Sequence, residues 1–186
     1  MALWGESGII ETAQLCVWLA SALIALSVSL LTRDPQRRAP LLALGVLALV
    51  AAAREYDLHI YLNPETLGQY GVRYRIDWLL DGSVPFWLKA GWIAIFATVG
   101  VILYAVVRRA GPQFKQMFAA RTPAALMLIG AVVFILIGYA LDDLMRGIFS
   151  GQRGPFEESA ELMAALLYLG AVITLAAAKT PASTRA

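Results

Sequence analysis

The residues of this 186-residue chain with the chemistry to bind a metal ion or move a proton are carboxylates and a single histidine. Several of them lie at the ends of long apolar runs. Glu55 and His59 are four residues apart, which places both on one face of a helix. Glu158 and Glu161 are three apart and also share a face, while Glu157 and Glu161, four apart, are the competing pair. The pattern predicts that paired acids enter the apolar part of the fold.

These acids converge on one predicted site. An ionisable group in hydrocarbon costs roughly 2.5–3.5 kcal/mol, so such groups normally face the interior of a helix bundle and have a partner there. We predict a metal site drawn from four helices, with the ligands Glu11, Glu55, His59, Asp143, Glu158 and Glu161. Whether Asp142 or Asp143, and Glu157 or Glu158, faces this site stays open. Carboxylates with one imidazole suit Zn, Mn or Fe, and the plan resembles that of di-metal bundles.

The same acids also have a structural explanation. Four basic residues are expected on the same side of the membrane and would neutralise acids by ion pairing: Arg54, Lys89, Arg146 and Arg153. Acids in the first turn of a helix interact favourably with its dipole, which accounts for Glu157 and Glu158. Metal binding and ion pairing therefore both remain open, and no catalytic residue is predicted.

The composition indicates which elements position these residues. Hydrophobic residues make up 60% of the chain and charged residues 15%, and the mean hydropathy is +0.68. Soluble domains are about half apolar and about a quarter charged, so a soluble fold is excluded. We expect an all-α polytopic membrane protein, one domain over residues 1–186, with five spans near residues 8–31, 39–59, 86–107, 122–145 and 156–178. No segment concentrates a basic face, which excludes nucleic-acid binding.

The basic residues predict the orientation. Nine of the fifteen, and only one of the thirteen acids, lie in residues 33–38, 108–121 and 179–185. By the positive-inside rule these segments are cytoplasmic, so the N-terminus lies outside and the C-terminus inside. The predicted location is a bacterial inner membrane. The loop at 60–85 is then outside, with an Asp81-Gly82 turn and an amphipathic segment at the membrane surface.

Four parts of the chain carry a resemblance: Glu11-x-x-Gln14, the segment Arg54-Glu55-Tyr56-Asp57-Leu58-His59, Lys89, and Glu157-Glu158-Ser159-Ala160-Glu161-Leu162. Together with the span pattern they resemble a group of small multi-span bacterial inner-membrane proteins with Arg-Glu-x-Asp-x-His and Glu-Glu-Ser-x-Glu-Leu segments. The resemblance implies the same site residues and the same membrane, and it implies no activity. The chain departs from the group at Leu141-Asp142-Asp143, where two acids stand in sequence.

Three functions are compatible with these features. The first is a metal-dependent membrane protein, an enzyme in one version, in which metal-bound water attacks a lipid or periplasmic substrate. The second is a structural or assembly subunit that binds a membrane-protein partner or further copies of itself, because the small residues of 39–53 and 164–178 allow close helix packing. The third is proton or cation transport, although no carboxylate continues the path through the inner halves of the spans. The sequence favours the metal site.

Overall fold

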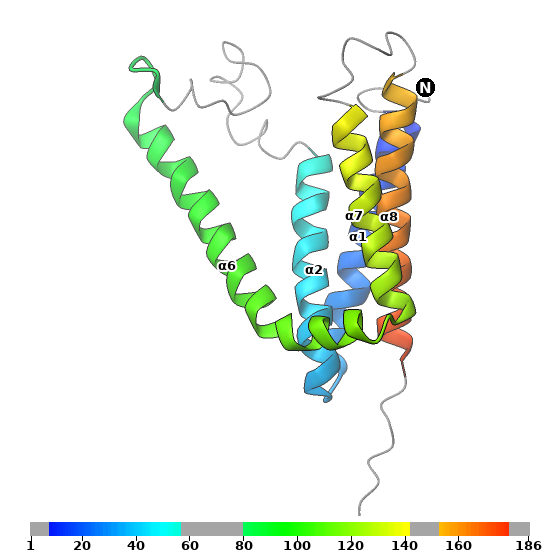
Figure 1. Cartoon of the computed structure of the whole chain (residues 1–186). Helices are drawn as coiled ribbons and strands as arrows, with labels where there is room; N and C mark the ends of the chain where they lie inside the picture. Colours follow the sequence, from blue (N-terminus) through cyan, green and yellow to red (C-terminus); the bar gives the residue numbers. More distant parts are fainter. Residues whose placement is uncertain (1–7, 57–79, 142–152, 179–186) are drawn as a thin grey trace, which may run out of the picture.

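A computed structural model of the chain describes residues 8–56, 80–141 and 153–178. Its regular structure there is entirely helical (Figure 1): α1 (Ile9–Leu31), α2 (Pro35–Glu55), α6 (Phe86–Ala119), α7 (Pro123–Tyr139) and α8 (Arg153–Ala177). Within these ranges α1, α2, α6 and α8 are long and apolar enough to cross a membrane, and α7 is a shorter apolar helix. The prediction of an all-helical protein suited to a membrane is therefore confirmed.

Several helices have limits different from those expected: α2 ends at Glu55 and not at residue 59, α7 ends at Tyr139 and not at residue 145, and α8 begins at Arg153 and not at residue 156. α2 begins at Pro35 and not at residue 39, because the Asp34 carboxylate accepts the backbone N–H of Gln36 at 2.9 Å and caps the helix. α6 continues beyond residue 107 and through Arg108 and Arg109 to Ala119. Arginine has a high helix propensity, so a pair of positive charges does not end a helix.

The starts of α6 and α7 follow the sequence signals. Thr122 caps α7 by accepting the backbone N–H of Ala125 at 3.3 Å, and a proline follows at the first helical position. Before α6, the Asp81 carboxylate accepts the N–H of Ser83 at 2.7 Å, which lowers the pKa of Asp81. The predicted Asp81-Gly82 turn is thus present. The amphipathic segment predicted further back in that loop lies outside the described residues.

α1, α2, α7 and α8 form the core of the bundle. α1 packs on α2 and on α8, and α7 packs on α8. Trp18 of α1 meets Tyr168 of α8 edge to face at 5.0 Å between ring centroids, and the Tyr168 hydroxyl donates to the Leu44 carbonyl of α2 at 2.5 Å. One aromatic pair therefore ties three helices together in the centre of the bundle.

Small residues allow the helix axes to approach one another. Several alanines of the core are completely buried, including Ala25, Ala48 and Ala165. At Gly45 a Cβ would lie 2.6 Å from Leu26 Cδ2 and 3.2 Å from the Leu26 backbone nitrogen, so only glycine fits between α1 and α2 here. This packing is the kind that stabilises helices in a bilayer, where apolar burial alone contributes little.

α6 is different from the other four helices. In Figure 1 it leans away from the bundle along most of its length, and its last turns run across one end of the bundle towards the start of α7. It packs mainly on α2, with a smaller contact to α7. Only 6% of its most apolar stretch is buried, against 33–39% in α1, α2 and α8. Most of α6 is thus not covered by the described chain.

Candidate functional site

The structure places four of the six predicted ligands. Glu11 is in the first turn of α1, Glu55 is the last residue of α2, and Glu158 and Glu161 are in the first half of α8. His59 and Asp143 lie outside the described residues, as does Asp142. The acids that are described do belong to the same end of the bundle, since α8 runs antiparallel to α2 (Figure 1).

Arg54 is the centre of the contacts between these acids. Its Nη2 lies 3.1 Å from Glu161 Oε1 and its Nη1 lies 3.8 Å from Glu55 Oε1. The guanidinium also lies over the Tyr139 ring, 5.2 Å from its centroid, which is the geometry of a cation–π contact. One arginine therefore links the ends of α2, α7 and α8. We call Arg54, Glu55, Tyr139 and Glu161 the Arg54 cluster.

The two carboxylates of the cluster are much less exposed than the arginine. The side chains of Glu55 and Glu161 are 10% and 18% exposed, whereas that of Arg54 is 54% exposed. The guanidinium is thus the most solvent-exposed charged group of the cluster. Removing it would take away the cation that both carboxylates share, in a position where water reaches them poorly.

Gly138 makes room for Glu161. A Cβ at this position would lie 3.1 Å from Glu161 Cγ and 3.8 Å from its Oε1. Neither Gly138 nor Tyr139 was among the predicted site residues. Two features of the sequence could have pointed to them. Both residues lie at the end of an apolar helix, level with the acids, and neither glycine nor tyrosine favours a helix there.

Gln14 ties α1 to the start of α8. The residue is 2% exposed, and its Nε2 donates to the backbone carbonyl of Glu158 at 2.9 Å. This contact explains why a polar amide lies one turn deeper than Glu11. In this bond Gln14 therefore binds the backbone of α8 and not a carboxylate.

The described residues do not assemble a metal site. Among them no three His, Cys, Asp or Glu side chains are close enough to hold one ion. What the structure brings together is an arginine with two acids, as the ion-pairing interpretation expects, while two of the predicted metal ligands lie outside the described residues. Chemically, the Arg54 cluster as described is a charged contact between helices, in which one guanidinium lies between two carboxylates.

A second feature lies where α6 meets the bundle. An apolar cleft of about 610 Å³ opens between α6 and the α2–α7 side of the bundle, and its walls include Leu44, Leu47, Val107, Phe114 and Val132. Its lining is almost entirely hydrocarbon. Trp18 and Tyr168 form part of its floor, so the cleft reaches the centre of the bundle.

The glycines of α6 differ from those of the bundle. A Cβ added at Gly45, Gly130, Gly138 or Gly170 would lie 2.6–3.1 Å from a side chain of another helix. A Cβ at Gly91, Gly100 or Gly111 of α6 would meet nothing within 4 Å. The glycines of the bundle are therefore used in packing within the chain, and those of α6 are not.

Comparisons with protein-family models, curated proteins and solved structures found no match to this chain. The described structure therefore defines only a structural class. The chain is an all-helical protein, and four of its described helices are long and apolar enough to span a membrane.

Proposed function

We propose that this chain is an assembly subunit of a membrane complex, in which α6 binds another transmembrane polypeptide. In this proposal all five helices cross a bacterial inner membrane, with the N-terminus outside. The single observation that carries the proposal is that the three glycines of α6 have no neighbours within the described chain, whereas the bundle glycines at 45, 130, 138 and 170 all do.

Exposure of an apolar helix does not by itself call for a partner, because lipid tails are as apolar as leucine. The glycines make the difference. Each glycine in a helix interior costs about 0.5–1 kcal/mol relative to alanine, through lost backbone entropy. In membranes this cost is offset where a glycine lets a second helix approach closely. Within the described chain, α6 gains no such contact at Gly91, Gly100 or Gly111.

The occupant that we propose for the cleft is α6 of a second copy. α6 exposes large apolar side chains, among them Ile93, Phe96, Val101 and Ile102, and the cleft beside it is equally apolar. Two copies that place these helices in each other's clefts make a self-complementary interface about a two-fold axis, which is the commonest symmetry of homo-oligomers. The Arg54 cluster then has a structural role, holding α2, α7 and α8 in the geometry that frames the cleft.

The oligomeric state in mild detergent tests this proposal. We expect the wild-type chain to elute with the protein mass of two copies, measured by light scattering with the detergent contribution subtracted. Gly100→Leu should shift it to one copy, because the new side chain fills the approach of the second helix. Gly82→Leu is the matched control, since a Cβ there also meets nothing but the residue precedes α6. A monodisperse wild-type monomer with no other protein bound would refute the proposal.

A divalent cation site is the second candidate, and one observation favours it. Glu55 and Glu161 come from different helices and share one cationic group, the guanidinium of Arg54. A Zn, Mn or Fe ion would be held by the same carboxylates, with His59, four residues after Glu55 in the sequence, as a further ligand. Such an ion would polarise a bound water and make it a nucleophile towards a lipid or periplasmic substrate.

Elemental analysis of the purified chain tests the cation site. On this candidate function, wild type carries a stoichiometric metal, Glu55→Ala and Glu161→Ala lose it, and Arg54→Met retains or increases it because the competing cation is gone. Asp34→Asn, at the opposite end of α2, is the control and should leave the metal content unchanged. Metal-free wild type, or full metal content in both glutamate variants, counts against the site.

A further inference from the structure

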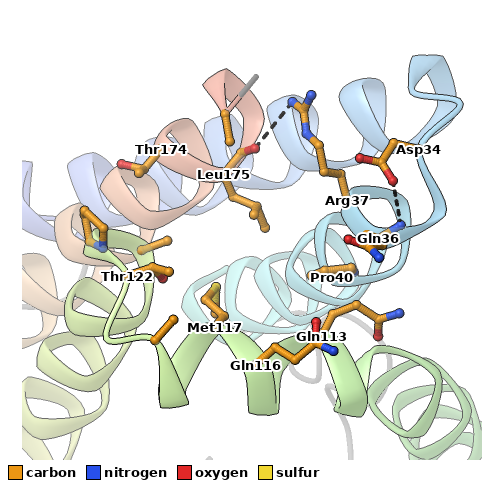
Figure 2. A pocket seen from close by; sticks show the side chains of 14 residues that line it. Asp34, Gln36, Arg37, Pro40, Gln113, Gln116, Met117, Thr122, Thr174 and Leu175 are labelled. Carbon is orange, nitrogen blue, oxygen red and sulfur yellow. Dashed lines mark hydrogen bonds between the residues drawn. The ribbon is translucent and has the colours of Figure 1, made fainter. Parts of the chain in front are cut away.

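A pocket lies at the end of the bundle opposite the Arg54 cluster. Its volume is about 490 Å³, and it is lined by the start of α2, the end of α6, the start of α7 and the end of α8. Figure 2 shows the side chains that line it, of which the polar ones include Asp34, Arg37, Gln113, Gln116, Thr122 and Thr174. Pockets with a few convergent polar groups on an apolar wall are typical of small-molecule sites.

The length of α6 places this pocket at the depth of lipid headgroups. The helix has 34 residues, which at 1.5 Å per residue is about 51 Å, whereas the hydrocarbon core of a bilayer is about 30 Å thick. Pro112 lies inside the helix. The last turns of α6 run across the end of the bundle (Figure 1). Gln113 and Gln116 belong to the end of α6 and line the pocket, so in a bilayer crossed by α6 they would lie at the membrane surface.

Arg37 is held in place by the end of α8, and one of its donors is unsatisfied. Its Nη2 donates to the Leu175 carbonyl at 3.4 Å and to the Ala176 carbonyl, both in the last turn of α8. Its Nε is buried and has no hydrogen-bond partner among the described residues. A buried donor without a hydrogen bond costs about 1–3 kcal/mol of stability. An acceptor with several oxygens, such as a phosphate, matches the planar array of donors on a guanidinium.

The second charge in the pocket has the opposite sign. Of the described residues that line it, only Arg37 and Asp34 are ionisable. One oxygen of the Asp34 carboxylate accepts the N–H of Gln36, which fixes the side chain at the start of α2. The remaining lining is amide, hydroxyl and apolar, with Pro40 and Met117 among the apolar residues. The pocket thus presents one fixed cation and one fixed anion, three residues apart in the sequence.

We propose that this pocket binds a zwitterionic phosphate ester of an amino alcohol, with the phosphate against Arg37 and the ammonium against Asp34. The amide of Gln116 completes the hydrogen bonds to the phosphate and its ester oxygens. The source of this group is either an ethanolamine phospholipid of the adjoining leaflet or soluble phosphoethanolamine. The pocket is formed by a single copy, so this inference is independent of the assembly proposal.

Native mass spectrometry of the full chain in mild detergent tests this site. The probes are a phosphatidylethanolamine, a phosphatidylglycerol with the same acyl chains, and phosphoethanolamine without acyl chains. We expect wild type to bind phosphatidylethanolamine about tenfold more tightly than phosphatidylglycerol, which corresponds to about 1.4 kcal/mol. Binding of phosphoethanolamine alone identifies a soluble source. Binding of the phospholipid alone identifies the membrane as the source.

Three variants separate the site from general attraction of lipid to a basic surface. Asp34→Asn keeps the cap of α2, because asparagine caps as well as aspartate, and it should abolish the tenfold preference while preserving the fold. Arg37→Gln should weaken both lipids about tenfold or more. Arg38→Gln is the matched control, with the same charge change one residue later at an exposed position outside the pocket. Equal wild-type affinity for the two lipids, or an equal loss in Arg38→Gln, overturns the proposal.

Discussion

The contact between Arg54 and Glu161 provides a quantitative test of the structural role of the Arg54 cluster. The perturbations are Arg54→Met, Glu161→Gln and the double variant, all of which keep side-chain volume nearly constant. At 3.1 Å, the Coulomb attraction between unit charges is about 5 kcal/mol for an effective dielectric constant of about 20 and about 1 kcal/mol in bulk water. Since Arg54 is 54% exposed, its hydration offsets much of the larger value.

We therefore expect a coupling free energy of about 1–3 kcal/mol for this pair, obtained from the double-mutant cycle. Arg54→Met alone should destabilise the chain by about 2–4 kcal/mol, because it also leaves Glu55 and Glu161 without the cation they share. Each free energy of unfolding is measured by reversible unfolding in mixed micelles that contain an increasing fraction of a denaturing detergent. Arg108→Met is the control, since Arg108 contacts Tyr104 of its own helix. A coupling below about 0.5 kcal/mol would show that the pair does not hold α2 to α8.

Three further substitutions test the packing of the bundle in the same unfolding assay. Gly45→Val should destabilise by about 1–3 kcal/mol, because a Cβ would lie 2.6 Å from Leu26, and no loss there would contradict the close approach of α1 and α2. Tyr168→Phe should cost about 0.5–1.5 kcal/mol by removing the bond to the Leu44 carbonyl, with the aromatic contact retained. Thr122→Ala should cost about 0.5–2 kcal/mol through loss of the α7 cap, and Thr122→Ser should restore most of it.

Much of the fold was predictable from the sequence, because long apolar runs with polar ends determine where membrane helices begin. The Thr122 cap and the Asp81 turn were also predictable, since both depend on interactions within a few residues. The continuation of α6 past Arg108 was not, because charges that suggest the end of a span do not end a helix. The direction of α6 relative to the bundle depends on contacts far apart in the sequence, and hydropathy carries no information about those.

The candidate site was predictable in part. The sequence indicated that Glu55 and Glu161 belong to one end of the bundle, and the structure places both against Arg54. The choice between a metal and an arginine as their cation depends on side-chain direction, which spacing along one helix does not determine. Gly138 was missed because its role is to leave space for a side chain of another helix. His59 and Asp143 lie outside the described residues, and their part in the site stays a prediction.

The number of copies per particle in a lipid bilayer tests the central proposal most directly. The chain, fused to a fluorescent protein at its C-terminus, is reconstituted into liposomes at less than one particle per vesicle, and photobleaching steps are counted. The assembly proposal predicts two steps per particle for wild type and for Gly82→Leu, and one step for Gly100→Leu. One step for wild type at every protein-to-lipid ratio would contradict it.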